Sequence, residues 1–275
     1  MTILLGLIFL AGIGLICYPT FANWWNSWNS FRVGESYEKK IESMSTEDLE
    51  RFLTEAKSYN TELMNNSGRY WLTDEEQARY DKILDVSGSG VMGSINIPSV
   101  KITLPIYHGT SEEVLAAGAG HLKGSSLPVG GMGTHTVITG HRGLPSAKLF
   151  TDLDQVVEGD YVILKVLNET LTYQIDMIRI VLPNEIDSLS IDPNQDLCTL
   201  VTCTPYGVNT HRMLLTGHRV ENRKEFELTK EAKQVNSKKV ALFIAIPLLV
   251  ILFVWLMWSD RKKKNIGKEV DEDEE

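Results

Sequence analysis

The sequence predicts a mainly β protein: a closed or nearly closed β-barrel preceded by a helical extension, with an apolar segment near each end of the chain. Three observations predict this class. Short apolar runs follow one another at close spacing between residues 91 and 220, which is typical of barrels. Residues 45–64 repeat apolar side chains at helical spacing. Residues 3–18 and 240–258 carry no charged side chain.

Residues 1–22 are predicted to be a membrane anchor or a signal segment. The apolar run from Ile3 to Tyr18 lacks the Lys/Arg start of a secretory signal, which favours a retained helix. Thr20 to Ala22 nevertheless offers small residues at a plausible cleavage spacing. In either case the middle of the chain is expected to be translocated.

Residues 23–88 are predicted to form the helical extension, which includes a possible lid. Trp24, Trp25 and Trp28 form an aromatic cluster that suits either a membrane interface or packing against the next helix. Ser45 or Thr46 can cap the helix over 45–64.

A second, shorter helix is expected in this extension. Thr73 and Glu76 form a capping box for a helix that reaches about Leu84. The glycine- and serine-rich stretch 86–90 then reads as a linker into the barrel.

Residues 89–222 are predicted to form the barrel, with one helix near 112–118. Each expected strand is a run of apolar or alternating residues that ends at glycine, proline, asparagine or a charged pair. The expected strands are 91–97, 100–107, 134–139, 161–167, 170–181, 197–203 and 211–220.

The C-terminal part is predicted to be a charged stalk (223–239), a transmembrane helix (240–258) and a charged cytoplasmic tail (259–275). Residues 240–258 are 19 uncharged residues, about 28 Å of helix, which is enough to span a bilayer. Arg261 to Lys264 follow directly, so the positive-inside rule places the tail in the cytoplasm and the barrel outside. Six acidic side chains at 269–275 contribute much of the negative charge behind the net charge of −9, and no basic stripe is left outside the membrane to bind nucleic acid.

Cys198 and Cys203 lie on one expected strand and cannot form a disulfide with each other. Five residues of extended chain separate their Cα atoms by roughly 16 Å, against a limit near 7 Å. Their odd spacing places them on opposite faces of the strand, so Cys198 can be a core residue while Cys203 faces a groove.

Cys203 ends an apolar strand, and Arg212 follows nine residues later on the returning segment. A thiol at a strand end is accessible to a substrate. An arginine folded back beside it can stabilise the thiolate or the charge that develops on a carbonyl oxygen under attack. This pattern predicts a cysteine nucleophile, with Arg212 as its charge stabiliser rather than a salt-bridged strand residue.

His141 is the candidate acid/base. The apolar run that ends at Thr139 delivers it into a turn between Gly140 and Gly143, where a side chain can project from a rigid scaffold. His211 should point to the opposite face from Arg212 and is interpreted as structural. No Cys-x-x-Cys pair or tight His/Cys ligand spacing is present, so neither a metal site nor a cofactor is predicted.

The runs TLVTCTPYGVNTHR and ITGHRG, together with IYHGT and GHL…SSLPVGG, resemble the class C sortases, which polymerise pilins. The resemblance covers roughly residues 90–220. It implies an eight-stranded sortase-type barrel and transpeptidation at a Leu-Pro-x-Thr-Gly-like sorting signal. The family's His–Cys–Arg site falls on His141, Cys203 and Arg212. The implied acceptor is an amine from a pilin lysine or a cell-wall peptide.

One departure from class C concerns the lid. Members of the class usually carry an Asp-Pro-aromatic sequence that plugs the site, but this chain has Gly68-Arg-Tyr-Trp-Leu72. Either Tyr70 or Trp71 plugs the groove without the acidic partner, or the enzyme is not autoinhibited in this way. Our hypothesis is that Trp71 partly occupies the groove.

These observations predict a membrane-anchored cysteine transpeptidase that acts on pilin or surface-protein substrates through a thioacyl intermediate. Housekeeping-type anchoring of surface proteins to the cell wall is one alternative. A surface cysteine peptidase, which would use water as the acceptor, is another. A non-enzymatic adhesin built on a β scaffold is a third and predicts ordinary reactivity for Cys203.

Overall fold

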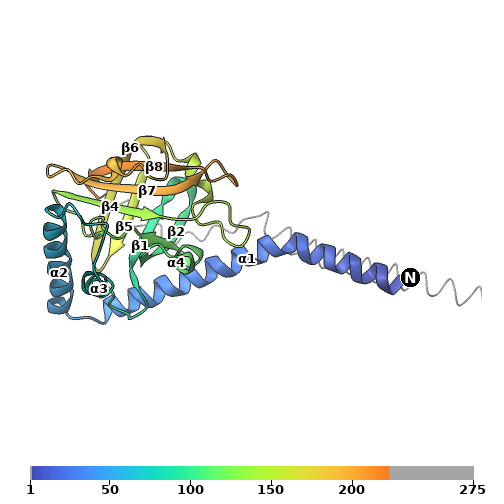
Figure 1. Cartoon of the computed structure of the whole chain (residues 1–275). Coiled ribbons are helices and arrows are strands. Elements are labelled where there is room, and N and C mark those ends of the chain that lie inside the picture. The colour runs from blue at the N-terminus through green and yellow to red at the C-terminus, as the bar shows by residue number, and fades with distance from the viewer. Residues whose placement is uncertain (1, 223–275) are drawn as a thin grey trace, which may run out of the picture. The chain divides into compact units, whose positions relative to one another are not determined.

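Eight strands close into a β-barrel, with three helices before the first strand and a fourth in the connection between the second and third strands (Figure 1). The computed structural model describes residues 2–222. The strands are β1 (Val91–Ile97), β2 (Ile102–His108), β3 (Ala119–His121), β4 (Thr134–Thr139), β5 (Tyr161–Val166), β6 (Glu169–Val181), β7 (Asp196–Thr204) and β8 (His211–Val220). The helices are α1 (Thr2–Glu42), α2 (Thr46–Met64), α3 (Asp74–Tyr80) and α4 (Glu112–Ala117), with short 3₁₀ turns η1 (Pro98–Val100), η2 (Thr151–Gln155) and η3 (Asp187–Leu189).

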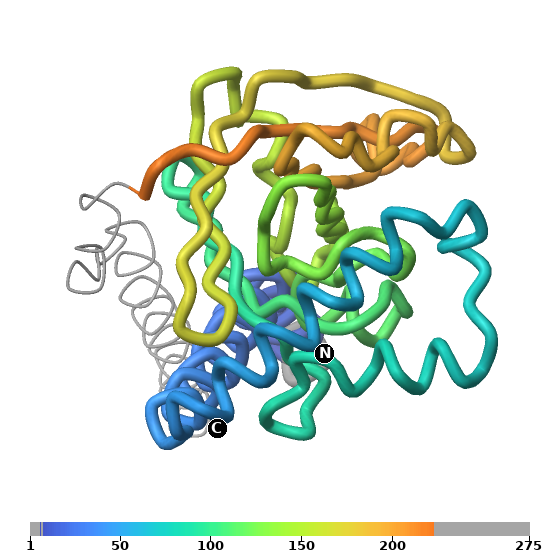
Figure 2. Tube along the Cα trace, turned by 90° about the vertical axis from the view of Figure 1, so that its left-hand side faces the viewer, coloured from blue at the N-terminus to red at the C-terminus, as the bar shows by residue number. Residues whose placement is uncertain are grey.

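The order of strands around the barrel is β1-β2-β3-β4-β7-β8-β6-β5. Two neighbouring pairs are parallel, β2 with β3 and β4 with β7, and the other pairs are antiparallel. The parallel β4–β7 pair brings the C-terminal ends of two strands that are far apart in the sequence to the same end of the barrel. The strands β7 and β8, orange in Figure 2, run antiparallel side by side.

Side chains that alternate along the strands point into the barrel and fill its interior. On β4 and β7, Ile138, Cys198 and Leu200 belong to the main core, whereas Val137 belongs to a second cluster on the other face of the wall. Burial of such side chains stabilises the fold by about 1.5–3 kcal/mol for each large apolar residue. The predicted strands and the helix near 112–118 are therefore confirmed, and β3 is an additional strand that the sequence did not predict.

The extension packs on the barrel through capped helices. Ser45 caps α2 by accepting from the Asp48 N–H, and Thr73 with Glu76 forms the predicted capping box of α3. The buried Asn60 side chain on α2 donates to the Leu127 carbonyl at 3.0 Å and accepts from the Leu127 N–H at 2.7 Å. These paired bonds fix α2 against the loop that leads into β4.

The helix α1 is longer than predicted, because it runs from Thr2 to Glu42 without a break and so crosses the predicted boundary after residue 22. Between Ile8 and Glu42 it is long and apolar enough to cross a membrane. Near its C-terminal end, Tyr37 and Ile41 are buried against the barrel. The predicted stalk (223–239), transmembrane helix (240–258) and tail (259–275) lie outside the described residues.

Candidate functional site

Cys203 lies one residue before the end of β7, on the outward face of the barrel wall. Cys198 and Leu200 point into the core, so the odd-numbered residues Thr199, Val201 and Cys203 point the other way. Cys203 is half-buried, whereas burial makes Cys198 inaccessible and raises the pKa of its thiol well above its usual range. All three cysteines of the chain are unpaired, which confirms that Cys198 and Cys203 do not bridge.

Arg212 lies directly across from Cys203 on β8, as its Cα partner in the antiparallel ladder. Residues that oppose each other in this way point to the same face, with Cβ atoms about 4.5–5.5 Å apart. The guanidinium Nη1 of Arg212 donates to the carbonyls of Asn209 at 3.2 Å and His211 at 3.1 Å. A guanidinium has five N–H donors, so one terminal nitrogen of Arg212 is held by the turn beside the thiol.

His141 follows β4 by two residues and reaches the same level of the barrel wall. In the parallel ladder Thr139 pairs with Val201, and the Gly140 N–H donates to the Val201 carbonyl at 3.1 Å. Continuing this register by two residues places His141 at the level of Cys203. The Thr202 hydroxyl donates to the Gly140 carbonyl at 2.8 Å and ties the two strand ends together.

The imidazole of His141 contacts α4. Its Nε2 lies 3.2 Å from Oε2 of Glu112, the first residue of that helix. Glu112 is 88% exposed, so this contact is weak in water and can be exchanged for a contact with substrate.

The loop that carries His141 is fixed by tight packing and by hydrogen bonds. A Cβ at Gly140 would lie 2.7 Å from the Phe150 ring, which explains the glycine at this position. The His141 carbonyl accepts from the Phe150 N–H at 3.0 Å. Gly143 has a φ of +82°, a conformation that favours glycine, and its N–H donates to Thr151 Oγ1 at 3.2 Å.

Arg142 and Tyr206 connect this loop to the turn between β7 and β8. The Arg142 side chain is 9% exposed, and its Nη2 forms an ion pair with Asp154 Oδ2 at 2.6 Å. Its guanidinium carbon lies 5.9 Å from the centre of the Tyr206 ring, and the same ring packs on Gly143. No role for Arg142, Asp154 or Tyr206 was predicted from the sequence. The one signal available was that Arg142 adjoins His141.

An apolar floor adjoins Cys203 and Arg212 on the outward face. It consists of the buried residues Val137, Leu189 and Leu214, against which Val201 and Val181 pack. Val201 and Leu214 are cross-strand partners two residues from Cys203 and Arg212, so the floor continues directly from the polar pair. This face therefore combines a thiol, a cation and a buried apolar cluster whose half-buried neighbours are Val181 and Val201.

The other histidines have structural partners. His121 is fully buried, accepts from Tyr80 Oη and donates to the Ser126 carbonyl, and burial lowers its pKa to about 4. Burial also lowers the pKa of His135, which bridges the Ser190 carbonyl and the Thr199 hydroxyl. His211 contacts the Thr210 hydroxyl at 2.9 Å. Within residues 2–222, no group of three His, Cys, Asp or Glu side chains is placed to hold a metal ion.

The segment that corresponds to a lid does not place Trp71 in a groove. A turn closed by the Trp71 N–H and the Gly68 carbonyl at 2.8 Å directs the indole outward, and the residue is 87% exposed. The hypothesis that Trp71 partly occupies the groove is therefore wrong for this structure. Tyr70 points inward instead and packs on Gly124, and the Arg69 guanidinium donates to the Leu189 carbonyl at 3.1 Å.

The chain is similar to known proteins of one family. The family model of the Sortase domain matches residues 95–220. The crystal structure of sortase C1 from Streptococcus agalactiae is 47% identical, covers 70% of this chain and 100% of its own, and superposes with a TM-score of 0.68. Sortase C from Streptococcus pneumoniae is 40% identical, covers 70% of this chain and 97% of its own, and gives a TM-score of 0.63. Sortase A of Streptococcus agalactiae is 35% identical over 42% of this chain, and the match spans 47% of that relative, about half its length.

Proposed function

The chain belongs to the sortase family of cysteine transpeptidases, and we propose that it cuts a Leu-Pro-x-Thr-Gly-like sorting signal and joins the freed carbonyl to an amine. The observation that carries this proposal is the pairing of Cys203 with Arg212 across β7 and β8. His141 completes the arrangement from the end of the adjacent strand β4.

In the first half-reaction the Cys203 thiolate attacks the carbonyl carbon of the threonine that precedes glycine. Negative charge moves to the carbonyl oxygen, and Arg212, on the same face of the sheet, stabilises it. His141, as imidazolium, donates its proton to the glycine nitrogen while the C–N bond breaks. The products are a thioester on Cys203, a free amine and a neutral His141.

In the second half-reaction an amine attacks the thioester carbonyl. Neutral His141 accepts a proton from the attacking nitrogen, and Arg212 again stabilises the oxyanion. Collapse of the intermediate breaks the C–S bond, forms the new amide and restores the thiolate and the imidazolium. The contact of His141 with exposed Glu112 must be exchanged for contacts with the reacting groups during this cycle.

The apolar floor supports the proposed substrate class. A leucine and a proline upstream of the cut bond are apolar, and the half-buried Val181 and Val201, which pack on the buried apolar floor, offer apolar side chains near the thiol. The solved neighbours support a pilin as the substrate, and we propose a pilin lysine as the acceptor. They include sortases of class C, and the structure of the Streptococcus pneumoniae member is described as informative on pilin substrate specificity.

We place the enzyme at the cell membrane, with the barrel outside and the C-terminal tail in the cytoplasm. Support comes from the apolar helix α1, which is long enough to cross a membrane, and from the uncharged stretch 240–258 with its basic flank. Sortases are typically membrane-associated, which agrees with this placement.

The test is to incubate the full-length protein with sorting peptides and with either a lysine-containing pilin peptide or a cell-wall peptide amine. Mass spectrometry of the product then identifies the new amide and its acceptor. We expect an amide to the lysine side chain. Transfer to the cell-wall amine alone would indicate wall anchoring, and hydrolysis despite excess amine would indicate a peptidase.

Two cysteine variants provide the control. Cys203→Ala should abolish both cleavage and amide formation. Cys17→Ala, which removes a cysteine of α1, should leave both unchanged. Amide formation by the Cys203→Ala protein would contradict the proposed function.

A further inference from the structure

One side of α1 carries a stripe of exposed aromatic side chains. Phe21, Trp24, Trp25 and Trp28 follow the spacing i, i+3, i+4, i+7, which aligns them on one face of a helix. They are 59%, 43%, 53% and 42% exposed. Trp28 stacks with Trp24 at 6.5 Å and contacts Trp25 at 5.4 Å between ring centres. We call these four residues the aromatic stripe.

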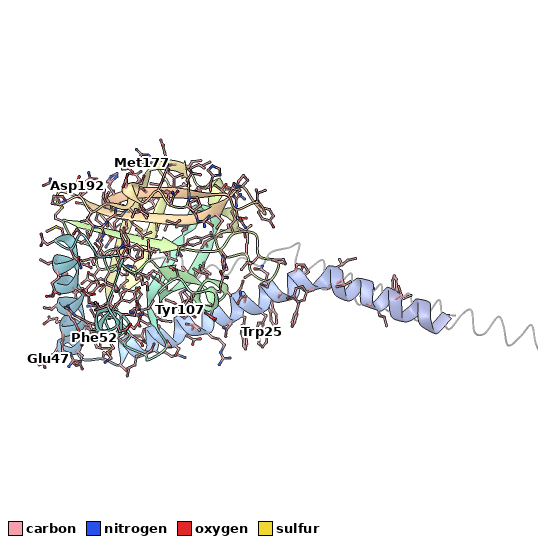
Figure 3. All side chains as sticks on the ribbon, in the orientation of Figure 1. Trp25, Glu47, Phe52, Tyr107, Met177 and Asp192 are labelled. Atoms are coloured by element: carbon pink, nitrogen blue, oxygen red, sulfur yellow. The ribbon has the colours of Figure 1, made fainter. Side chains whose placement is uncertain are left out.

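The opposite side of the same helix is attached to the barrel. The Lys148 N–H donates to Asn23 Oδ1 at 2.9 Å, the Asn26 amide donates to the Ala116 carbonyl at 3.3 Å, and Ser30 Oγ donates to the Ala117 carbonyl at 3.4 Å. At about 100° per residue, these three positions centre half a turn away from the aromatic stripe. Figure 3 shows Trp25 projecting from the side of α1 that faces away from the barrel.

Contact with the barrel therefore does not explain the aromatic stripe. An exposed row of three tryptophans and a phenylalanine is unfavourable in water, since each ring leaves a large apolar area hydrated. Indole rings that combine an apolar body with one N–H donor are enriched where a bilayer meets water.

The charge pattern of α1 favours a lipid surface. Residues 1–31 contain no charged side chain, and the first charge, Arg32, lies 4.9 Å from the centre of the Trp28 ring. The neighbours of the stripe are asparagine, serine and alanine, which are compatible with headgroups. Pro19 lies inside α1 between the apolar run and the stripe, where its missing N–H allows a bend. Figure 1 shows α1 changing direction between its two halves.

We propose that the aromatic stripe lies in the headgroup region of the bilayer while the other side of α1 holds the barrel. This inference rests on the proposed membrane anchoring and goes beyond it. The contacts at Asn23 and Asn26 reach the loop that follows His141 and the helix α4, whose Glu112 contacts His141. The stripe thus orients the candidate site with its His141 side toward the membrane surface. The barrel is then held in one orientation and does not rotate freely on a flexible tether.

The experiment measures the fluorescence of the stripe in lipid vesicles. The full-length protein carries Trp71→Phe, Trp255→Phe and Trp258→Phe, so that only Trp24, Trp25 and Trp28 remain. It is reconstituted into phosphatidylcholine/phosphatidylglycerol vesicles that carry bromine near the headgroup or deep in the acyl chains. We expect at least a twofold loss of fluorescence with the shallow bromine and a smaller loss with the deep bromine.

The matched control keeps Trp71 alone, whose exposed indole lies on the extension and should lose little fluorescence with either lipid. Protein that floats with the vesicles but shows no quenching of the stripe would overturn the inference and leave the anchor in place. A crosslinking reaction on the same vesicles is run in parallel. If the stripe is not quenched and crosslinks form between the stripes of two molecules, the surface binds a second copy of the chain and the inference is overturned. Failure of the protein to float with the vesicles would refute both the anchor and the stripe. Transpeptidation is measured separately with a water-soluble sorting peptide.

Discussion

The hydrogen bond between Thr202 and Gly140 offers a direct way to test how the site is held together. Thr202 precedes Cys203 and Gly140 precedes His141, and the Thr202 hydroxyl donates to the Gly140 carbonyl at 2.8 Å. Both residues are buried. Thr202→Val keeps the shape of the side chain and removes this donor.

The expected magnitude follows from burial. A buried carbonyl that loses a hydrogen-bond donor costs about 1–3 kcal/mol, and valine recovers part of this through its added methyl group. We expect the free energy of unfolding to fall by about 1–2 kcal/mol. Because the bond also sets the spacing between Cys203 and His141, we expect kcat to fall about tenfold, equivalent to about 1.4 kcal/mol, with little change in KM.

Thr136 provides a matched control on the adjacent strand β4. Its hydroxyl is buried without a partner among the described residues, so Thr136→Val should be neutral or slightly stabilising. Urea unfolding and the kinetics of peptide transfer are measured for both variants. If Thr202→Val behaves like Thr136→Val in both assays, the tether between the two strand ends is not part of the site.

Three further predictions follow from the same structure. Tyr206→Ala should lower kcat severalfold because it releases the turn from Gly143, whereas Tyr206→Phe should retain activity. Equal losses of kcat for the two variants in steady-state assays would argue against a role for ring packing. Iodoacetamide at pH 8 should label Cys203 and spare buried Cys198, as peptide mapping would show, and labelling of Cys198 in folded protein would contradict the assigned faces. Because burial lowers the pKa of His121 to about 4, the unfolded chain binds more protons between about pH 6.5 and 4. The stabilising contribution of neutral His121 should therefore be fully present above about pH 6.5 and fall by about 3 kcal/mol by about pH 4, so the pH profile of stability should be flatter in His121→Gln.

Much of the barrel could be predicted from the sequence because strand periodicity is local. The alternation around Ile95 and the long runs that end at Cys203 and Val220 identify strands without knowledge of their partners. The strand β3 could not be found in this way. Ala119–His121 is three residues long and is defined by its parallel pairing with β2, which depends on tertiary contacts.

The helices, too, could be predicted where the signal is local and not where it depends on tertiary contacts. Capping residues such as Ser45 and Thr73 locate the starts of α2 and α3. The continuity of α1 was missed because the stretch of Asn, Ser and Trp after Ala22 has low helix propensity. Its conformation is stabilised by contacts with the barrel, including the bond from Tyr37 Oη to the Met92 carbonyl at 3.0 Å.

The candidate site was partly predictable. Cys203 and Arg212 could be placed together because a short turn separates two strands, which fixes their register within narrow limits. The environment of His141 depends on loops whose shape is set by distant residues. The contacts of Arg142 with Asp154 and Tyr206, and the outward direction of Trp71, therefore had no local signal.

The proposed reaction requires Cys203, Arg212 and His141 to act together on one carbonyl group. Intact mass spectrometry of the enzyme mixed with a sorting peptide, without added amine, detects the acyl-enzyme that this cooperation produces. We expect an acyl adduct that maps to Cys203, accumulates about 10²–10³ times more slowly in Arg212→Ala and is absent in Cys203→Ala. An adduct on another residue, or one that forms at the same rate without Arg212, would refute the assigned roles.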